Sequence, residues 1–189
     1  MFAFKKKYFF IIETIKDLDL RNIKKSKKFI VIYRRKYTQE DTSILAKFRH
    51  ECKTRSIKFY VANDYELAFK LKSDGIYISA YNKDLKYLNY KNSKFDIIGS
   101  AHNIKEINEK IKQNCTYIIL SRLFLVDYKK ELKYLGLNKF NQYSLIFKNL
   151  LPLGGIKLSN LNKMKLINSN YICLLSEIKK KPAIISRLF

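Results

Sequence analysis

Basic and polar side chains recur along the chain directly after short apolar runs, at the points where buried strands would end. These residues are Arg34, Lys36, Asn63, Asp64, Asn82, Ser100, His102, Lys129 and Ser176, together with the pair Gly154-Gly155. Side chains that follow separate strands of one parallel sheet meet at a single edge of that sheet. Arg and Lys attract phosphate groups. The pattern therefore indicates a site for a phosphorylated ligand.

The pair Gly154-Gly155 is the most informative of these features. Adjacent glycines after a strand let backbone N–H groups approach a phosphate where a side chain would clash. The hydroxyl of Ser176, after the next run, could add to the same cradle. The alternative interpretation is that the two glycines only make a tight turn, and two glycines alone do not separate the two.

Apolar runs alternate with segments of helical period, which is typical of repeated β–α units and a parallel sheet. Eight runs are rich in β-branched and aromatic residues: 8–12, 29–33, 58–62, 75–78, 96–99, 117–120, 150–153 and 171–174. Apolar residues at helical spacing occupy 42–52, 65–71, 104–111 and 158–167. We expect an α/β fold, a (β/α)8 TIM barrel formed by residues 1–189 as a single domain. Its active site would lie at the carboxyl ends of the strands.

The barrel is expected to be compact, with shortened or missing helices. The connection 83–94 is too polar for a good helix, and only 182–189 remains for a last one. Pro152 falls inside the seventh run. Because proline has no N–H, it should remove a ladder hydrogen bond from a strand that is expected to be buried.

The chain has 189 residues, with 39 Lys and Arg against 16 Asp and Glu, and a formal net charge of +23. Such a surface attracts phosphates, nucleic acid or acidic lipid, so a basic nucleic-acid-binding protein is one functional alternative. Only 7 of the basic residues are Arg, and they form no cluster beyond Arg34-Arg35. Nucleic-acid readers usually cluster Arg, and the many Lys, Ile, Asn and Tyr residues fit an AT-biased coding composition. We therefore do not expect nucleic acid as a partner.

Cys52, Cys115 and Cys173 are far apart and odd in number, which indicates neither a disulfide framework nor a zinc site. No stretch approaches the roughly 18 apolar residues of a membrane span. The run 8–12 is also shorter than the core of a signal peptide. We expect a soluble, cytoplasmic protein with no membrane partner.

Four stretches of the chain, in order, resemble the thiamine-phosphate synthase and TenI family from Tyr8 to Ile178. They are Asn63-Asp64-x-x-Leu67-Ala68 with Ser73-Asp74-Gly75-Ile76 (N-D-x-x-x-L-A and A-D-G-V-H in the family), Ile98-Gly99-Ser100-Ala101-His102-Asn103 (G-x-S-A-H-S), Tyr117-Ile118 with Phe124 and Lys129 (D-Y-I, G-P-x-F and a lysine), and Leu153-Gly154-Gly155-Ile156 with Asn160 (A-L-G-G-I and an Asn). The order and the nearly conserved spacing make the resemblance fairly specific.

The resemblance implies a barrel enzyme of thiamine biosynthesis, a transferase that joins hydroxymethylpyrimidine diphosphate to a thiazole phosphate. It releases pyrophosphate with the help of Mg²⁺. Small phosphorylated substrates would then be its partners, and a homodimer is one assembly it could form. A diphosphate leaves easily only when a metal ion and cations absorb its developing charge, so the abundance of basic residues is consistent with this chemistry.

The resemblance also implies roles for individual residues. The implied contacts are Arg34 and Lys36 to the diphosphate, Asn63 to the diphosphate or the pyrimidine, Ser100 to the pyrimidine, and the amides around Gly154-Gly155 with Ser176 to the thiazole phosphate. Asp64 and Asn82 fall at metal-ligating positions. Lys129 would neutralise the leaving pyrophosphate, and with Arg34 and Ser100 it makes up the implied catalytic set.

Five positions depart from the family pattern. A family Gln is Ile32 here, a Mg²⁺-ligating Asp is Asn82, a threonine-rich stretch includes Val126, a Gly opening the eighth phosphate loop is Tyr171, and Arg122 stands where the TenI branch has a proton-transferring His. An Asn carbonyl carries no charge, so the affinity for Mg²⁺ should fall. A synthase of weakened activity, a TenI-like thiazole tautomerase that works without metal, and a catalytically degenerate phosphate-ligand-binding relative all stay open.

Overall fold

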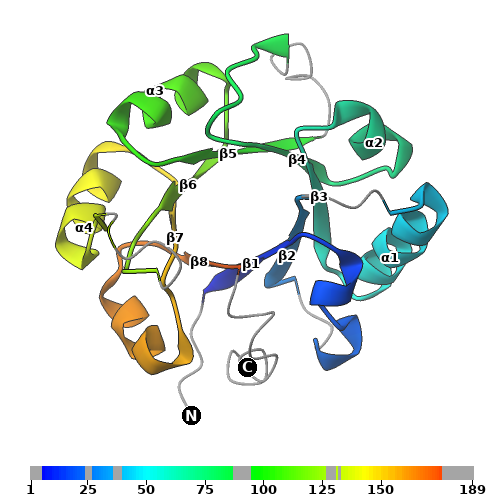
Figure 1. Ribbon diagram of the computed structural model, residues 1–189, viewed down its shortest axis with the longest axis horizontal. Coiled ribbons are helices and arrows are strands. Elements are labelled where there is room, and N and C mark those ends of the chain that lie inside the picture. The colour runs from blue at the N-terminus through cyan, green and yellow to red at the C-terminus, as the bar shows by residue number, and fades with distance from the viewer. Residues whose placement is uncertain are drawn as a thin grey trace.

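Eight parallel strands form a ring in the computed structural model, and the helices surround it (Figure 1). The structure describes residues 6–23, 27–35, 40–86, 95–126, 131 and 133–175. The strands are β1 (Lys7–Ile12), β2 (Phe29–Tyr33), β3 (Lys58–Ala62), β4 (Gly75–Ile78), β5 (Asp96–Ala101), β6 (Tyr117–Ser121), β7 (Leu150–Leu153) and β8 (Tyr171–Leu174). They coincide closely with the eight apolar runs, so the predicted (β/α)8 barrel is confirmed.

The hydrogen-bonded order of the strands is β8-β1-β2-β3-β4-β5-β6-β7. Alternate residues of each strand face opposite sides, as pleating requires. Phe9 and Ile11 of β1 belong to the cluster that fills the barrel, whereas Phe10 of the same strand packs in the outer cluster beneath the helices. Both faces of every strand are therefore covered by apolar groups, which explains why the runs in the sequence are continuously apolar.

β7 and β8 are the two ends of this sheet, and Pro152 lies at the seam between them. The carbonyl of Leu153 accepts a hydrogen bond from the N–H of Leu123, on the side of β6, at 2.8 Å. The backbone nitrogen of Pro152, one residue earlier, consequently faces β8, with which β7 has no ladder in the described part of the chain. The Leu150 carbonyl on that same side accepts from the Ser169 hydroxyl at 3.0 Å. The described ladder is thus missing on the side where Pro152 offers no N–H, as expected for this proline.

The helices are α1 (Thr42–Thr54), α2 (Tyr65–Lys70), α3 (Ile104–Lys112) and α4 (Leu137–Ile146), with 3-10 helices at Ile15–Asp17, Leu20–Asn22 and Leu158–Leu166. The predicted helices at 42–52, 65–71 and 104–111 correspond to α1, α2 and α3. Asn103 caps the start of α3, because its side chain accepts from the Glu106 N–H at 2.9 Å. The four α-helices lie outside the ring of strands (Figure 1).

Two β–α units differ from a regular barrel within the described residues. The first connection contains two 3-10 turns in place of a helix, and the seventh is the long 3-10 helix at Leu158–Leu166, so the expectation of shortened helices is confirmed. α4 was not predicted from the sequence. Residues 87–94 and 176–189 lie outside the described residues, and missing helices there stay a prediction, as does a single domain over 1–189. No helix in the described part of the chain has the length and apolar character needed to cross a membrane.

Candidate active site

Arg34 follows β2 and reaches over the carboxyl end of the barrel. Its backbone N–H donates to the Ile12 carbonyl at 2.8 Å, which continues the pairing of β2 with β1 and fixes where the side chain starts. Its guanidinium lies 3.7 Å from a carboxylate oxygen of Glu13, the first residue after β1. The side chain remains about one-third exposed, at 34%. A cation held in this way can still contact an incoming phosphate.

Asn63 is the centre of a polar network at the ends of β3 and β4. It adopts a left-handed backbone conformation, with φ of 56°, which Asn tolerates better than most residues. Its side-chain oxygen accepts from the Ser79 N–H at 2.9 Å and from the Asn82 amide at 3.3 Å. Its side-chain nitrogen donates to the hydroxyls of Ser79 and Tyr81. The predicted site residues Asn63 and Asn82 are thus brought into contact.

Asp64 directs its two carboxylate oxygens to different partners. One accepts from the Leu67 N–H at 2.9 Å and caps the start of α2. The other lies 3.1 Å from the guanidinium of Arg35. Asp64 thus caps α2 in the structure, and metal ligation stays a prediction.

An open cavity of about 470 Å³ adjoins these groups. Its lining residues are Arg35, Ala62, Asn63, Asp64, Tyr65, Glu66, Tyr81 and Lys86. They come from the carboxyl ends of β2, β3 and β4, the edge at which barrel enzymes place their active sites. A volume of this size falls within the range of small-ligand sites.

Ser100 lies in β5 and is buried, beside the phenol of Tyr77 from β4. Burial raises the pKa of Tyr77, and the nearby Ser100 hydroxyl and Arg34 guanidinium oppose that effect. Tyr77 therefore connects two predicted site residues from beneath the barrel mouth. His102, after β5, is exposed and interacts with Glu106 of α3 at 2.9 Å, so its local role is to join the strand end to the helix start.

Gly154 and Gly155 both have positive φ, at 99° and 66°. A Cβ on Gly155 would lie 2.5 Å from the Leu125 carbonyl oxygen, and one on Gly154 would lie 3.1 Å from Cα of Arg122. The glycines therefore let the chain after β6 pass directly over the chain after β7, where the Phe124 N–H donates to the Gly154 carbonyl at 3.0 Å. The tight-turn interpretation is supported by this contact, and phosphate binding stays a prediction.

Three predicted site residues, Lys36, Lys129 and Ser176, lie outside the described residues. Tyr171, which the resemblance put at the opening of the eighth phosphate loop, begins β8 instead. Its hydroxyl interacts with that of Tyr117, the first residue of β6, at 3.0 Å, at the amino end of the barrel. That part of the interpretation was wrong, because Gly154 and Gly155 follow the carboxyl end of β7.

Sequence reasoning missed Glu13, Tyr77 and Tyr81, and noted Arg35 only as the neighbour of Arg34. Glu13 directly follows the first apolar run, which is the same signal that selected Arg34. Tyr77 could have been found from strand alternation, because it lies two residues from Gly75 on the barrel-facing side of β4. Tyr81 has no comparable signal, because its position depends on the path of a loop.

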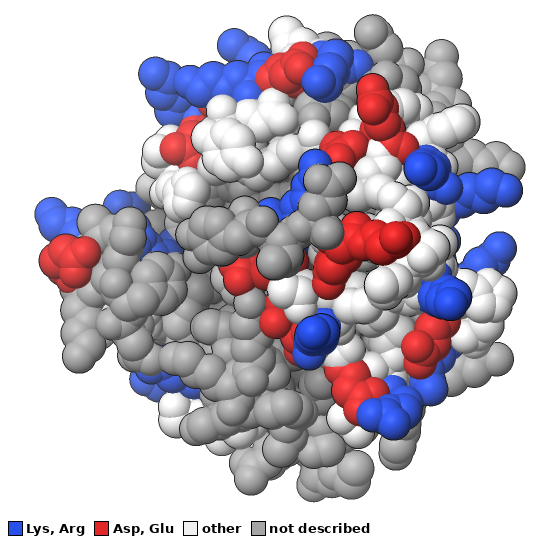
Figure 2. Space-filling view, turned by 45° about the vertical axis from the view of Figure 1, so that its right-hand side comes forward, with Lys and Arg blue, Asp and Glu red and all other residues white. Residues whose placement is uncertain are grey.

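Charge is mixed over the part of the surface that Figure 2 shows. Asp and Glu side chains lie among the Lys and Arg side chains there, and the basic groups do not merge into one patch in the described part of this face. The described residues also include ion pairs such as Arg49–Asp74 at 3.1 Å and Lys58–Asp96 at 2.6 Å. The described part of this face therefore offers no continuous basic track of the kind that a nucleic-acid backbone follows.

The donor groups near Asp64 can be compared with the needs of Mg²⁺. In the described part of the chain, no group of three or more His, Cys, Asp and Glu side chains comes together as a metal site. Asp64 supplies one carboxylate, and the side-chain oxygen of Asn82 accepts from the Asp84 N–H at 3.0 Å. Mg²⁺ is commonly bound by one or two carboxylates together with substrate phosphates and water. Asp64 therefore fits an ion that arrives with a diphosphate, rather than a permanently bound ion.

Comparisons with known proteins agree with the resemblance found in the sequence. A family model described as thiamine monophosphate synthase matches residues 17–178. The thiamine-phosphate synthases of Prochlorococcus marinus strain AS9601 and Bacillus cereus strain B4264 are 29% and 28% identical over 132 and 113 residues. These matches cover 67% and 58% of this chain, and 37% and 51% of the relatives. The chain thus spans between about a third and a half of the length of these curated relatives.

Solved structures share the barrel. A thiamine phosphate pyrophosphorylase from Pyrococcus furiosus superposes with a TM-score of 0.73 at 14% identity, covering 98% of this chain and 96% of that one. Phosphoribosylanthranilate isomerase from Thermotoga maritima gives a TM-score of 0.61 at 11% identity, covering 97% and 100%. At such low sequence identity, the two structural matches support the barrel fold of this chain and nothing beyond it.

Proposed function

Because the chain belongs to the thiamine monophosphate synthase family, we propose that it joins hydroxymethylpyrimidine diphosphate to a thiazole phosphate and releases pyrophosphate. In this reaction the bond between the pyrimidine methylene carbon and the diphosphate oxygen breaks, and the diphosphate keeps the electron pair. The thiazole nitrogen forms the new bond to that carbon. The observation that carries the proposal is the position of Asn63 and Asp64 beside the cavity of about 470 Å³, with Arg34 at the carboxyl end of the neighbouring strand β2.

The chain must bind the diphosphate and stabilise the charge that develops as it leaves. The guanidinium of Arg34 is accessible and only 3.7 Å from Glu13, a distance at which a phosphate can compete with the carboxylate. The Asn63 amide group is proposed to contact the same diphosphate. Ser100 and Tyr77 lie beneath the barrel mouth. Lys36 and Lys129 are proposed, from the family resemblance alone, as further cations. Cations placed where charge develops lower the barrier for departure of pyrophosphate.

Mg²⁺ is proposed as the cofactor, bound through Asp64 with Asn82 beside it. When bound with the diphosphate, the ion would supply positive charge to the leaving group. Since Asp64 contacts Arg35 at 3.1 Å, binding of the ion requires that this ion pair open or that Arg35 turn toward the phosphates. The thiazole phosphate is proposed to bind on the opposite side of the barrel mouth, at the amides around Gly154-Gly155 and at Ser176.

The contacts of Asp64 favour a second function, one that needs no metal. Asp64 is already engaged by Arg35 and by the N–H of Leu67, and the neutral Asn82 replaces a second carboxylate. A metal-independent relative, a TenI-like tautomerase or a binding protein for a phosphorylated thiazole, would need neither carboxylate. Cytoplasmic location and a homodimer stay predictions under both functions.

Pyrophosphate release tests the proposal. The purified chain is mixed with the pyrimidine diphosphate, the thiazole phosphate and Mg²⁺, and each component is then omitted in turn or chelated with EDTA. The proposal expects release of pyrophosphate and an equal amount of thiamine phosphate only when all three are present. Binding of the thiazole phosphate without release would favour the second function, and absence of binding and release would contradict both.

A further inference from the structure

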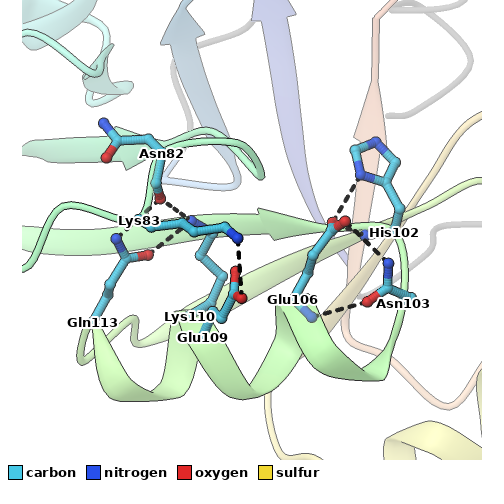
Figure 3. Close-up of polar contacts among 8 residues, drawn as sticks. All are labelled: Asn82, Lys83, His102, Asn103, Glu106, Glu109, Lys110 and Gln113. Carbon is cyan, nitrogen blue, oxygen red and sulfur yellow. Dashed lines mark hydrogen bonds and ion pairs between the residues drawn. The ribbon is translucent and has the colours of Figure 1, made fainter.

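α3 contains a lysine that the barrel buries completely. Lys110 is 0% exposed, and its ammonium donates to the backbone carbonyl of Asn82 at 2.6 Å and to the side-chain oxygen of Gln113 at 2.7 Å (Figure 3). Gln113 is 1% exposed, and its amide donates to the carbonyls of Asn82 and Asp84 at 3.0 and 2.9 Å. Both side chains thus hold the backbone of residues 79–86, here named the β4 loop.

The burial of Lys110 is unfavourable unless its hydrogen bonds offset it. Burial lowers the pKa of its ammonium, and the two acceptors that the structure gives it are neutral oxygens rather than carboxylates. An apolar residue would fill this place at less cost in desolvation. The retained charge therefore indicates a need to fix the Asn82 carbonyl in one position, which an apolar side chain could not do.

Gly99 of β5 creates the space for this lysine. A Cβ on Gly99 would lie 2.7 Å from Cδ of Lys110 and 2.8 Å from Sγ of Cys115. The Lys110 stem therefore crosses β5 where the strand has no side chain, and it reaches the β4 loop beyond. An ion pair between Lys83 and Glu109, at 3.5 Å, adds a second link between the loop and α3.

The opposite side of the β4 loop contacts the candidate active site. Ser79, Tyr81 and Asn82 of this loop all hydrogen-bond to the Asn63 side chain. Asn82 is the residue that joins the two sides, because its carbonyl is held by Lys110 and its side-chain amide donates to Asn63 at 3.3 Å. A displacement of the loop backbone at Asn82 would consequently move Asn63 and its partners.

We propose that Lys110, with Gln113, is a positioning residue that holds the β4 loop so that Asn63 and Asn82 stay in place for the pyrimidine diphosphate. This inference rests on the proposed function for the identity of the ligand, and on the contacts of α3 with the loop for the positioning itself. The ammonium of Lys110 donates to the loop backbone and to Gln113, so it acts on Asn63 through the loop.

Hydrogen exchange tests the positioning without any substrate. In Lys110→Met the backbone N–H groups of Ser79, Asn82 and Asp84 should exchange about tenfold faster, while those of β1 and β2 stay unchanged. Lys112→Met is the matched control, because it removes an exposed lysine from the same helix. Gln113→Met is a second variant that leaves the ammonium in place, and it should raise the same exchange rates by a smaller factor. Unchanged loop exchange in both variants would overturn the proposal.

Kinetics test whether the positioned loop serves the pyrimidine diphosphate. Lys110→Met should raise the KM for the pyrimidine diphosphate about tenfold and leave the KM for the thiazole phosphate within twofold. A merely structural role would lower kcat through a smaller folded fraction and leave both KM values unchanged, which would overturn the proposal. If the unsubstituted chain shows no turnover, that result contradicts the proposed function and not the positioning role of Lys110. The exchange experiment then still decides the role of Lys110.

Discussion

The two ends of the barrel interior use similar polar groups in different ways. At the amino end, Asp96 accepts from the Lys58 ammonium at 2.6 Å and from the Tyr60 hydroxyl at 2.7 Å. The hydroxyls of Tyr117 and Tyr171 pair at 3.0 Å. At the carboxyl end, the Arg34–Glu13 pair is longer, at 3.7 Å, and a cavity of about 470 Å³ adjoins Asn63 and Asp64.

This difference separates groups that close the barrel from groups that can accept a ligand. Charges and hydroxyls at the amino end satisfy one another at short distances, so they stabilise the fold and leave little for a ligand. At the carboxyl end the Arg34–Glu13 pair is longer, and a cavity gives a ligand access to Asn63 and Asp64. Substitutions at the amino end should therefore change stability, and substitutions at the carboxyl end should change turnover.

The largest expected effect is that of Arg34→Met. Removing a cation aimed at developing charge should lower kcat/KM for pyrophosphate release about a hundredfold. The melting temperature should change by no more than about 2 °C, because the Glu13 pair is long and partly exposed. Steady-state kinetics and thermal unfolding of the same preparation measure both. A large loss of stability with little loss of turnover would remove the distinction between the two ends.

A smaller effect, on stability, is expected for Gly155→Ala. Its positive φ and the 2.5 Å approach of the Leu125 carbonyl should together lower the free energy of unfolding by about 2–3 kcal/mol. Gly136→Ala is the matched control, since Gly136 also has a positive φ but has open space where its Cβ would be, and about 1 kcal/mol is expected. Urea denaturation measures both values. Equal losses would mean that close packing after β7 has no effect.

Tyr60→Phe tests the amino end. The hydroxyl of this buried tyrosine donates to Asp96, so its removal should lower the free energy of unfolding by about 1 kcal/mol. Turnover per folded molecule should remain unchanged, because Asp96 and Lys58 lie at the end opposite to the candidate site. Urea denaturation and active-site-normalised kinetics give the two numbers. A loss of turnover of more than twofold would show that the amino end affects the candidate site, against this prediction.

The smallest effect concerns alkaline pH. Burial raises the pKa of Tyr171 to about 12, above its unfolded value of 10.0. Because the unfolded state loses this proton first, the contribution of Tyr171 is complete below pH 10 and is lost as the pH rises toward 12. The free energy of unfolding of the native chain should therefore fall more steeply between pH 10 and 12 than that of Tyr171→Phe. Parallel slopes would show that Tyr171 titrates normally.

Much of the fold follows from local sequence patterns. Eight apolar runs gave the strands because both faces of each strand are covered, and the Asn103–Glu106 cap marked the start of α3. α4 escaped prediction because a glycine precedes it and no side chain caps it. Pro152 indicated a missing ladder hydrogen bond, but the sequence does not tell which side of the strand its nitrogen faces.

The site was predictable where a residue follows a strand directly, as Arg34, Asn63 and Asp64 do. It was not predictable where a contact depends on space left by a residue that is distant in the sequence. Lys110 lies in a helix with two other lysines, Lys105 and Lys112, so the sequence pattern suggests that it is part of a solvated face. Its burial depends on Gly99 in another element. Tyr171 shows the reverse error, because a family position was assigned to one barrel end and the residue lies at the other.

The central claim is that the carboxyl end of the barrel binds both phosphorylated substrates and joins them. Thermal unfolding at fixed ionic strength, with the thiazole phosphate alone and with the pyrimidine diphosphate plus Mg²⁺, tests it when pyrophosphate is assayed in the same samples. We expect each ligand to raise the melting temperature, and pyrophosphate to appear only when both are present. No shift with either ligand and no pyrophosphate would contradict the claim, and would mean that the chain keeps the barrel of its family without the activity.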